Sequence, residues 1–598
     1  MGERPGNRQA LQLRAGPLTL LFEPELAFLR YVRLGSTEVL RGIYAAVRDQ
    51  NWGTVPPRVT HLQVEQAAES FRLSFDVECI QEEIDFAWRG TLTGDASGSV
   101  TYRMEGVARS RFRRNRIGFC VLHPASVAGL DCRVEHVDGS LEEGRFPDRI
   151  APHQPFFRIR ALTHPVGSGV EAEVRLDGDT FEMEDQRNWT DASFKTYCTP
   201  LGLPFPVEVE AGTRMSQSVT LRLRGSAPPA IAAPEAPVEI SLDDARRHPL
   251  PEIGLALGPG PMTEQQLERL KRLHLGHLRV DLRLDLGDYP ARLRQAVEVS
   301  AELNCRLHLA LHVTDDAEAE LRALASLTKL DALREATWLV YRHRGQAVTE
   351  PWAGLARRIL EERLGSVTVG GGTDAYFTEL NRGRPPLPEG APVSFSLNPQ
   401  VHAFDDASLL ETLEVQGLTV RDAQALYPGH PVYVSPVTLR PRFNPAATDL
   451  GAEELSPADP RLNQNFGAAW TLGSLCSLIS YNPASITYHE THGAAGVIGR
   501  RAPESALAEE HDVSPLYRMF AEVGELGGGE AQARLLGSPP WAAALLLRNG
   551  ERRRGLVANL TGERLTVRLR GHPSSPEPDE LAPYRVAIFE DHGVRRGE

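Results

Sequence analysis

Residues 1–226 alternate apolar and polar positions in short runs, and Gly, Asp and Asn turn residues separate these runs. Alternation with a period of two is typical of strands that bury one face. Regular spacing without intervening helical patterns predicts a large antiparallel β-sandwich. The clearest runs are Leu18–Phe22, Phe71–Val77, Ile84–Leu92, Ser99–Met104, Gly169–Leu176 and Ser216–Leu223.

A stretch rich in proline and alanine follows the last of these runs. It reads GSAPPAIAAPEAP over residues 225–237. Such a composition continues neither a helix nor a central strand. We therefore expect residues 227–250 to link the sandwich to a second domain.

Residues 251–528 alternate strand patterns with helical patterns, which is typical of a parallel α/β architecture. One helix is expected over Thr263–Leu275, with Thr263 as N-cap and Gly276 just past its end. Eight strands in this length predict a (β/α)₈ TIM barrel. A doubly wound open sheet is the alternative, but no Gly-rich nucleotide turn follows the first strand. The expected strands are Ile253–Leu257, His277–Leu284, Arg306–Val313, Trp338–Tyr341, Ser366–Gly370, Val393–Leu397, Val432–Val437 and Ser485–Tyr488.

The pattern returns to strands from residue 529 to residue 598, which predicts a small C-terminal β domain. The chain is thus expected to be multidomain, with a sandwich, a barrel and a terminal sheet. The expected terminal strands are Trp541–Arg548, Arg554–Asn559, Leu565–Arg570 and Tyr584–Glu590.

Charge and composition narrow the class of partner. The formal net charge is −14, from 65 Lys and Arg against 79 Asp and Glu. Nucleic-acid binding requires a basic surface, so this balance argues against it. The first residues lack a signal-peptide core, and no run approaches the length of a membrane span. The six cysteines are scattered without paired spacing, so we expect free thiols and a cytoplasmic protein. The sequence leaves a homo-oligomer open.

Polar residues gather where the expected barrel strands end, and this is where TIM barrels carry their active sites. The expected catalytic pair is Glu490, in YHETHG after the eighth strand, and Glu379, in FTELNR after the fifth. Asp374 and Arg442 also follow strand ends. The residues expected to bind substrate in the barrel are His489, His492, His402, Asn398, Asp281, Arg279, Tyr376 and Arg440.

Each of these residues also has a structural interpretation. Glu379 would look the same as a surface glutamate, and His402 and His489 could be structural histidines. Asp281 alternates with Arg279, so an internal salt bridge is a serious rival. The HETH run lacks the spacing of the helical zinc motif, so no metal or other cofactor is expected. The sequence nevertheless leaves a bound metal open. No G-x-S-x-G elbow is present, which argues against a serine hydrolase.

The N-terminal domain contains one unusually polar stretch, FEMEDQRNWTDASFKTYC, at residues 181–198. It contributes Glu184, Asp185 and Asn188 as further candidate binding residues. A solvated loop is the simpler interpretation. The functional interpretation is a loop that covers the barrel mouth and excludes water.

Several motifs together resemble the D-apionate lactonase family. They are NRIGFCVLHP (115–124), FPDRIAPHQPF (146–156), EMEDQRNWTDASFKTYC (182–198), FTELNR (377–382), NPQVHAFDD (398–406) and YHETHG (488–493). The resemblance implies hydrolysis of D-apionolactone to D-apionate in branched-sugar catabolism. It also implies the layout of a multidomain glycosidase. The candidate site residues come from strand ends and not from the resemblance.

The sequence therefore favours a carbohydrate-lactone hydrolase in which Glu490 activates water or attacks the carbonyl. Glu379 or a nearby histidine would protonate the leaving oxygen. The alternative is a glycoside hydrolase that uses the same two carboxylates, retaining at about 5–5.5 Å separation and inverting at about 6.5–9.5 Å. A third class is a carbohydrate-binding protein without activity.

Overall fold

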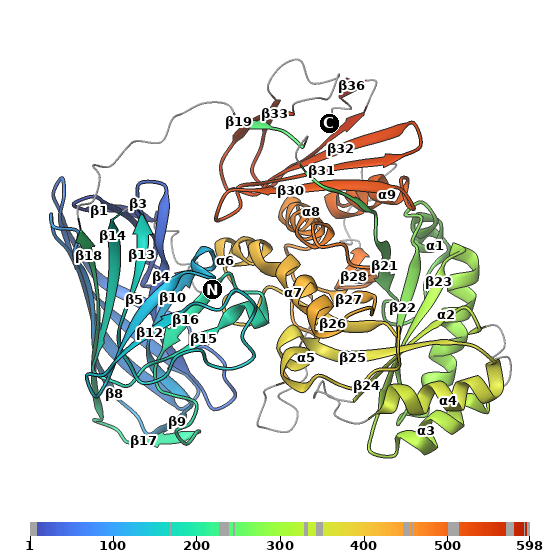
Figure 1. Cartoon of the computed structure of the whole chain (residues 1–598), viewed down its shortest axis with the longest axis horizontal. Coiled ribbons are helices and arrows are strands. Elements are labelled where there is room, and N and C mark those ends of the chain that lie inside the picture. The colour runs from blue at the N-terminus through green and yellow to red at the C-terminus, as the bar shows by residue number, and fades with distance from the viewer. Residues whose placement is uncertain are drawn as a thin grey trace, which may run out of the picture. The chain divides into compact units, whose positions relative to one another are not determined.

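The computed structural model divides the chain into two compact units (Figure 1). One unit comprises Met1–Arg187, Ala192–Glu235 and Ala446–Glu453, and the other comprises Asn188–Asp191, Ala236–Pro445 and Glu454–Glu598. The structure describes residues 9–167, 169–225, 238–242, 245–327, 333–342, 351–445, 455, 458–499, 513–569, 579–590 and 593–594. Residues 227–237 and 243–244 of the expected linker lie outside the described residues.

The first unit contains two antiparallel sheets. In spatial order, one sheet consists of β1 (Leu11–Ala15), β2 (Leu18–Glu23), β3 (Phe28–Leu34), β4 (Thr37–Arg48), β10 (Arg116–Pro124), β16 (Ser193–Tyr197) and β15 (Glu182–Asp185). The other consists of β12 (Leu141–Arg145), β11 (Asp131–His136), β13 (Ile159–Gly167), β14 (Val170–Asp177), β18 (Arg214–Gly225), β8 (Val100–Ala108), β7 (Ile84–Gly94), β6 (Phe71–Gln81) and β5 (Pro57–Gln66). β9 (Phe112–Arg114) and β17 (Val207–Val209) form a separate pair.

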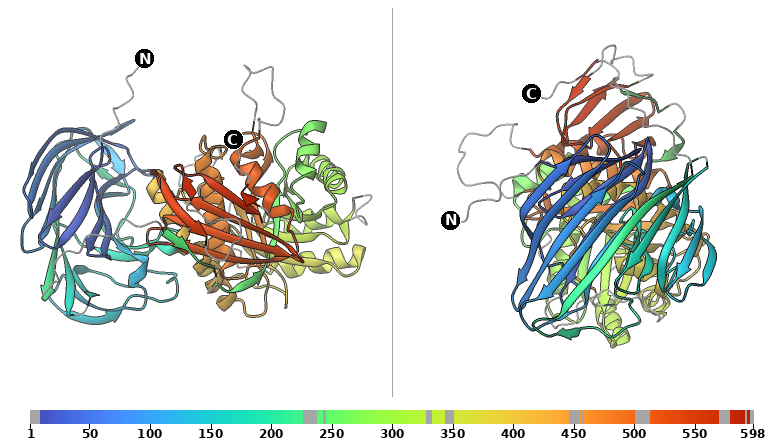
Figure 2. Two further views of the ribbon diagram at one scale, coloured as in Figure 1. Left: turned by 90° about the horizontal axis from the view of Figure 1, so that it is seen from above. Right: turned by 90° about the vertical axis from the view of Figure 1, so that its left-hand side faces the viewer.

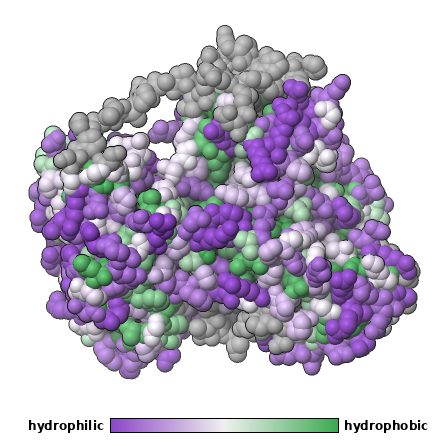
Figure 3. Space-filling view, in the orientation of Figure 1, coloured by the Kyte–Doolittle hydropathy of each residue, from purple (hydrophilic) through white to green (hydrophobic). Residues whose placement is uncertain are grey.

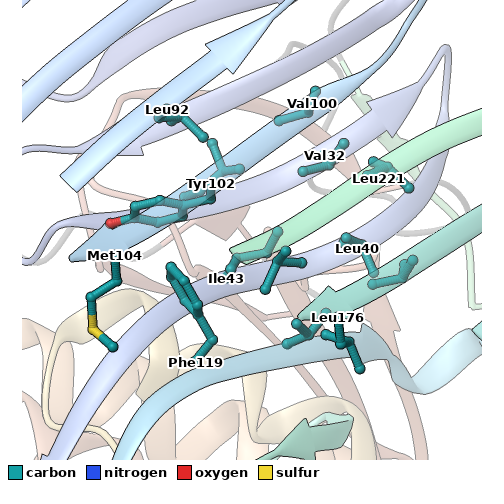
Figure 4. Packing of buried hydrophobic residues seen from close by; sticks show 14 of the residues in the cluster. Val32, Leu40, Ile43, Leu92, Val100, Tyr102, Met104, Phe119, Leu176 and Leu221 are labelled. Carbon is teal, nitrogen blue, oxygen red and sulfur yellow. The ribbon is translucent and has the colours of Figure 1, made fainter. Parts of the chain in front are cut away.

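Alternation along the strands explains how this unit forms its core. Val100, Tyr102 and Met104 of β8 are buried, while the residues between them are exposed to a greater degree. Their side chains meet those of the first sheet in a shared apolar layer (Figure 4). The Tyr102 hydroxyl donates to the Ala27 carbonyl oxygen at 2.7 Å, which satisfies the polar group that this ring carries into the core.

The second unit contains the predicted barrel. Its eight strands pair in parallel and in chain order, and β21 also pairs with β28, which closes the cylinder. The short strand β29 (Gly496–Ile498) pairs with β28. The barrel strands are β21 (Glu252–Ala256), β22 (His277–Arg283), β23 (Arg306–Val313), β24 (Thr337–Arg342), β25 (Thr368–Tyr376), β26 (Val393–Leu397), β27 (Val432–Val437) and β28 (Ser485–His492).

Helices follow most of the barrel strands. They are α1 (Glu264–Lys271), α2 (Tyr289–Leu303), α3 (Ala317–Ala325), α4 (Trp352–Leu364), α5 (Phe377–Gly383), α6 (Asp406–Glu411), α7 (Leu413–Leu426), α8 (Asn465–Ile479) and α9 (Pro515–Gly524). Thr263 is the N-cap, as expected, and it forms a capping box with Gln266. The expected end of α1 was wrong, because the helix ends at Lys271 and Gly276 lies beyond it. A Cβ on Gly276 would come within 2.5 Å of Glu252 Cγ, so this glycine makes room for a side chain.

The C-terminal residues form antiparallel strands, as expected. The larger sheet has the order β20 (Arg247–Pro249), β30 (Glu530–Leu536), β31 (Ala542–Asn549), β32 (Arg552–Asn559), β35 (Val586–Glu590) and β36 (Gly593–Val594). A smaller sheet joins β19 (Val238–Ile240), β33 (Leu565–Leu569) and β34 (Asp579–Leu581). Residues directly after position 237 therefore contribute strands to this C-terminal part.

The larger C-terminal sheet packs on helix α8, as the view from above shows (Figure 2). Cys476 on this helix lies within 3.4 Å of the Ala544 carbonyl oxygen of β31. This packing explains why α8 is apolar on nearly all sides: one face covers the barrel and another meets the sheet.

On the face shown in Figure 3, hydrophobic residues among the described part of the chain occur in small scattered groups. Scattered apolar residues are normal on a protein surface. Within the described residues, no helix has both the length and the apolar character needed to cross a membrane.

The capping box gives a first prediction. Thr263→Ala should lower the free energy of unfolding by about 1 kcal/mol, because the backbone amide of Gln266 loses its acceptor. Thr263→Ser keeps the hydroxyl and is the matched control. Denaturant unfolding measures both variants, and equal stability of alanine and serine at this position would contradict the assignment.

Candidate active site

A fully buried arginine lies at the centre of the barrel. Arg279 of β22 has no exposed surface, and its Nη2 donates to Asp281 Oδ1 at 2.7 Å and to Asp374 Oδ1 at 2.6 Å. Its Nη1 donates to the Ser435 carbonyl oxygen of β27 at 2.7 Å. A buried charge is tolerated only when it is paired and hydrogen-bonded. Arg279 thereby connects β22, β25 and β27 through their inward side chains and backbone.

A second arginine joins this network from the loop after β27. Arg442 Nη2 donates to Asp374 Oδ1 at 2.6 Å, and its Nη1 lies 3.6 Å from Asp281 Oδ1. His312 at the end of β23 donates from Nε2 to Asp281 Oδ1 at 3.0 Å, with the proton placed on that nitrogen. The Asp281 side chain nevertheless keeps 38% of its surface exposed, so the network opens to solvent at the strand ends.

The two aspartates stay ionised despite their surroundings. Burial by itself would raise the pKa of the Asp281 carboxyl, but Arg279, His312 and Arg442 outweigh it and hold the pKa well below its usual range. Burial also opposes ionisation of Asp374, and Arg442 and Arg279 lower the pKa of that carboxyl as well. The two carboxylates are therefore fixed negative charges and not proton-exchanging groups.

Glu490 reaches this network because strand β28 contains a bulge. Leu255 and Ala256 are consecutive on β21, yet they pair with Tyr488 and Glu490, so His489 is the extra residue. His489 adopts a φ of 35°, and both it and Tyr488 contact helix α8. The Thr487 side chain points into the barrel. In a regular strand, side chains alternate, so His489 would also point into the barrel and Glu490 would point out of it. The bulge reverses this and turns Glu490 toward Asp281.

The environment makes Glu490 a weak acid. Burial raises the pKa of its carboxyl to about 7, and the negative charge of Asp281 adds to the effect. Arg292 and Arg442 partly offset it. Arg292 is held in place from helix α2, where Nη1 donates to the Gly258 carbonyl oxygen at 2.9 Å. A carboxyl with this pKa exchanges protons near neutral pH, as a general base or acid requires.

Glu379 has a similar pKa for a different reason. It lies in the first turn of α5, where its carboxyl accepts hydrogen bonds from the backbone amides of Tyr376 and Glu379 itself. Burial outweighs these bonds and raises the pKa of the carboxyl to about 7. Its Oε2 atom is buried and has no hydrogen-bond partner among the described residues. The surface interpretation of Glu379 was therefore wrong.

Tyr376 interacts with Asn398, with Glu379 and with the arginine network. The Tyr376 hydroxyl donates to the Phe443 carbonyl oxygen at 3.3 Å, next to Arg442 in the sequence. Burial raises the pKa of Tyr376, and the nearby Glu379 raises it further, while a hydrogen bond with Asn398 and the charge of Arg442 lower it. Tyr376 thus interacts with both ends of the site.

The tip of the polar 182–198 stretch is grouped with the barrel. Asn381 Nδ2 donates to Asn188 Oδ1 at 3.0 Å, and the Thr190 hydroxyl donates to the Asn398 carbonyl oxygen at 3.2 Å. His402 Nδ1 lies 2.7 Å from Asp191 Oδ2. These four residues, Asn188–Asp191, belong to the same compact unit as the strand ends that they contact. Asn188 and His402 therefore lie beside Asn398 and α5.

Three other expected binding residues are held by neighbouring groups of the protein. The His489 ring lies outside the barrel, where Nε2 is 3.1 Å from Thr471 Oγ1, so it does not face the strand ends as expected. His492 bonds to Thr491 and to the Pro259 carbonyl oxygen. Arg440 pairs with Asp459 at 3.1 Å. Sequence position near a strand end was therefore not sufficient to select inward side chains.

Glu184 and Asp185 belong to the first unit, where both form ion pairs. Asp185 and Arg187 are buried together at 2.7 Å, and the Ala151 amide also donates to Asp185. Glu184 pairs with Lys195 of the neighbouring strand β16. Within this unit, the two carboxylates join β15 to its surroundings.

Two groups of described residues have the spacing of metal ligands. Asp281, His312 and Asp374 form one group, and Glu252, His277 and His308 form the other. The first group is already neutralised, because both Arg279 and Arg442 donate to Asp374 at 2.6 Å. Its oxygens are better explained as arginine acceptors than as metal ligands.

Sequence reasoning underrated several residues of this site. Asp374 and Arg442 follow strand ends but were left out of the expected binding set, and His312 and Arg292 were not considered. His312 ends the third strand, so the strand-end rule could have found it. Arg292 lies on a helix, and no local signal indicates that it reaches the loop after β21.

The buried arginine gives a second prediction. Arg279→Met should lower the free energy of unfolding by about 3–5 kcal/mol, because two carboxylates lose their shared counter-ion inside the barrel. Arg442→Met removes another donor to Asp374, but its side chain is 22% exposed. This matched variant should lower the free energy of unfolding clearly less than Arg279→Met does. Denaturant unfolding at neutral pH measures both, and equal costs would contradict the central place of Arg279.

Comparisons with known proteins cover most of the chain. A family model described as the N-terminal domain of D-apionate lactonase matches residues 1–226, and one described as its TIM barrel domain matches residues 252–528. A curated protein from Brucella anthropi, named D-apionate lactonase, is 31% identical over 554 residues. The match spans 88% of this chain and 89% of that protein.

Solved structures resemble the chain more distantly. A β-arabinopyranosidase has 10% identity and a TM-score of 0.30 over 97% of this chain and all of its own. A glycoside hydrolase family 30 xylanase from Clostridium acetobutylicum has 8% identity and a TM-score of 0.37 over 59% and 98%. A conserved exported protein from Bacteroides fragilis has 9% identity and a TM-score of 0.40 over 58% and 99%. Likenesses of this size say nothing about chemistry.

Proposed function

The chain belongs to the D-apionate lactonase family, and on this premise we propose that it hydrolyses D-apionolactone to D-apionate. The structural observation that carries the proposal is Glu490, a carboxyl with a pKa of about 7 beside two arginines at the barrel mouth. A lactone is a cyclic ester, so its hydrolysis needs an activated water, a stabilised oxyanion and a proton for the leaving oxygen.

Glu490 is the proposed general base. Its carboxylate takes a proton from water while the water oxygen forms a bond to the lactone carbonyl carbon. The carbonyl oxygen becomes an oxyanion, and the Arg442 guanidinium, 22% exposed at the mouth, is the proposed donor that stabilises it. Because Asp374 and Asp281 hold Arg442 before substrate binds, little reorganisation is needed during the reaction.

Glu379 is the proposed general acid. When the tetrahedral intermediate collapses, the bond from the carbonyl carbon to the ring oxygen breaks, and Glu379 gives its proton to that oxygen. The product has a free hydroxyl and a carboxylic acid, which ionises. The proton that Glu490 received returns to solvent, and solvent reprotonates Glu379. A pKa of about 7 supplies the protonated form near neutral pH.

The remaining polar groups suit the hydroxyls of a sugar. The exposed part of Asp281 accepts hydrogen bonds, while Tyr376 and Asn398 offer donors and acceptors next to Glu379. Asn188 and His402 border the same region. We assign Arg279 a positioning role, because its donors are already used by Asp281, Asp374 and Ser435.

The charge of the site favours a lactone over a glycoside. Ester hydrolysis passes through an anionic intermediate, which the Arg442 and Arg292 charges near Glu490 stabilise. Glycoside hydrolysis passes through a transition state with oxocarbenium character, which is positively charged. Two guanidiniums beside the reacting carboxylate would oppose that charge.

We further propose that the enzyme works in the cytoplasm on a small-molecule substrate. All six cysteines are free thiols, and five of them are buried. Free buried thiols suit a reducing compartment. The net charge of −14 remains an argument against nucleic acid as a partner.

A substrate panel tests the proposal. The purified chain should open D-apionolactone faster than other aldonolactones, and it should leave aryl glycosides intact. Acid release followed at constant pH measures lactone opening, and chromophore release measures glycoside cleavage. Cleavage of a glycoside without lactone opening would establish the alternative activity instead.

The pKa of Glu490 predicts the pH dependence. Only deprotonated Glu490 acts as a base, so kcat/KM should rise as the pH increases through about 7. An ordinary glutamate, with a pKa of about 4.3, would place this rise at a much lower pH. Above a pH of about 7, Glu379 loses the proton that it must donate, so kcat/KM should fall again. The profile of kcat/KM against pH should therefore be bell-shaped. Glu490→Gln should reduce kcat by about 10²-fold or more.

Glu318→Gln on the exposed surface of α3 is the matched control and should leave the profile unchanged. Thermal melting of Glu490→Gln shows whether the variant remains folded. A folded Glu490→Gln variant that keeps most of its kcat and its acid limb would contradict the assigned role.

A further inference from the structure

Three arginines of the first unit lie together without a carboxylate partner. Arg48 ends β4 and Arg116 begins β10, and the two residues are paired directly across these neighbouring strands (Figure 1). Arg114 ends β9, two residues before Arg116. None of the three forms an ion pair with any residue that the structure describes. Like charges opposite each other in a sheet are destabilising, so this arginine cluster needs an explanation.

The guanidinium groups of Arg114 and Arg116 share one acceptor. Arg116 Nη1 donates to the Asn115 carbonyl oxygen at 2.6 Å, and Arg114 Nη1 donates to the same oxygen at 3.3 Å. The Asn115 amide donates to the Arg48 carbonyl oxygen at 3.0 Å, which joins the third arginine to this point. Arginine stays charged throughout the physiological pH range. Two positive charges are therefore held close together around a neutral group.

The cluster is deeply buried for its charge. Arg116 is 4% exposed and Arg48 is 8% exposed. Burial lowers the pKa of Arg114 and of Arg116, and the charge of Arg114 lowers the pKa of Arg116 further. The Nε atoms of Arg114 and Arg116 are buried, and in the described part of the chain neither has a hydrogen-bond partner. A buried charge is stable only with a counter-charge and hydrogen bonds, and here the counter-charge is missing.

Two carboxylates act on these arginines from a distance, but other groups already donate to both. Asp179 raises the pKa of Arg114, and its Oδ1 accepts a hydrogen bond from the Thr180 amide at 2.7 Å. Glu182 raises the pKa of Arg116, and its Oε1 accepts a hydrogen bond from the Leu201 amide at 2.7 Å. Among the described residues, neither carboxylate forms an ion pair with the cluster. They weaken the local positive charge without binding it.

The other partners of the cluster are neutral. Arg116 Nη2 donates to the Pro200 carbonyl oxygen at 3.2 Å, and Arg48 Nη1 donates to the Trp52 carbonyl oxygen at 3.3 Å. Such carbonyls satisfy single N–H groups, but they carry no net charge. The simplest structural interpretation, three arginines that only brace the backbone, therefore leaves both the charge and the two Nε atoms unexplained.

Two aromatic rings cover the Arg116 guanidinium. Its Cζ lies 5.1 Å from the ring centroid of Trp52 and 5.1 Å from that of Phe205. Stacking on a ring leaves the edge of a guanidinium, where all its N–H groups lie, available for other partners. Phe205 is 39% exposed and lies in the exposed segment 202–206. Its ring is therefore the outer cover of the cluster.

We propose that Arg48, Arg114 and Arg116 form a binding site for a small oxyanion, either a phosphate group or a carboxylate. Guanidinium groups suit both, because their N–H groups bond in parallel to the oxygens of these anions. The anion supplies the missing counter-charge, and its oxygens accept from the Nε atoms of Arg114 and Arg116. Movement of the exposed Phe205 ring gives it access from solvent.

The site is distinct from the strand ends that hold Glu490, and it does not depend on the proposed function. The net charge of the chain is −14, so its overall field repels anions. Binding at the arginine cluster must therefore come from local contacts and not from general attraction. This makes a single exposed arginine elsewhere on the same strand a fair comparison.

The test titrates the full-length protein with inorganic phosphate and, separately, with acetate. Calorimetry should show about one anion bound per chain. The bound anion should also raise Tm above the value in sodium chloride of the same ionic strength, because it binds the folded chain. Binding of phosphate without acetate assigns a tetrahedral ligand to the site, and the reverse assigns a carboxylate. Absence of saturable binding of both anions overturns the proposal.

Arg114→Gln should weaken anion binding by about tenfold or more, because it removes a charged hydrogen-bond donor. Arg113→Gln is the matched control. Arg113 is the exposed middle residue of the same strand, so this change removes the same charge without touching the cluster, and the variant should bind like the wild type. Binding that persists unchanged in Arg114→Gln contradicts the site.

The effect of the anion on stability separates a binding site from a purely structural cluster. Without phosphate, Arg114→Gln should have a Tm equal to or above that of the wild type, because it relieves repulsion between buried charges. At saturating phosphate the order should reverse. If the arginines only brace the backbone, Arg114→Gln lowers Tm by the same amount in both conditions, and the proposal fails.

Discussion

The barrel depends on the burial of one positive charge. Arg279 has no contact with solvent, and a charge in that position is stable only with carboxylates and a carbonyl around it. Asp281, Asp374 and the Ser435 carbonyl supply these partners from three strands. The interior at this level is therefore a polar network and not the packed aliphatic layers that usually fill such barrels. The pKa values of Glu490 and Tyr376 then respond to charges of this network.

Glu490 and Glu379 have the same pKa of about 7 for different reasons. Burial and the charge of Asp281 raise the pKa of Glu490, while at Glu379 burial outweighs two backbone donors and the charge of Arg382. Arg442 connects these environments, because it pairs with Asp374 and influences both Glu490 and Tyr376. A site with two such carboxyls is suited to moving protons in both directions near neutral pH.

The two ends of the barrel hold opposite kinds of polar cluster. At the carboxyl ends, each carboxylate of the network is matched by a guanidinium or an imidazole. At the amino ends, buried nitrogens of His277 and His308 have no hydrogen-bond partner among the described residues. The first arrangement is complete as it stands, which suits preorganised catalysis.

The sequence by itself determined the architecture of this protein. Period-two runs and alternating strand and helix patterns depend on local chemistry, so they predicted the sandwich, the barrel and the terminal sheet. The Thr263 N-cap was predictable for the same reason. Family motifs such as YHETHG indicated the lactonase family. Strand ends also indicated Glu490, Glu379, Asp281 and Arg279, because parallel strands place their carboxyl ends together.

Only the tertiary structure decided which of these side chains meet. His489 and Glu490 are adjacent, and a single bulge against β21 turns one outward and the other inward. Arg292 reaches the site from a helix, and Glu252, His277 and His308 converge from three strands. Gly276, which resembled a helix end, instead clears space for Glu252. These outcomes depend on register and packing between segments distant in the chain, and local sequence does not encode that information.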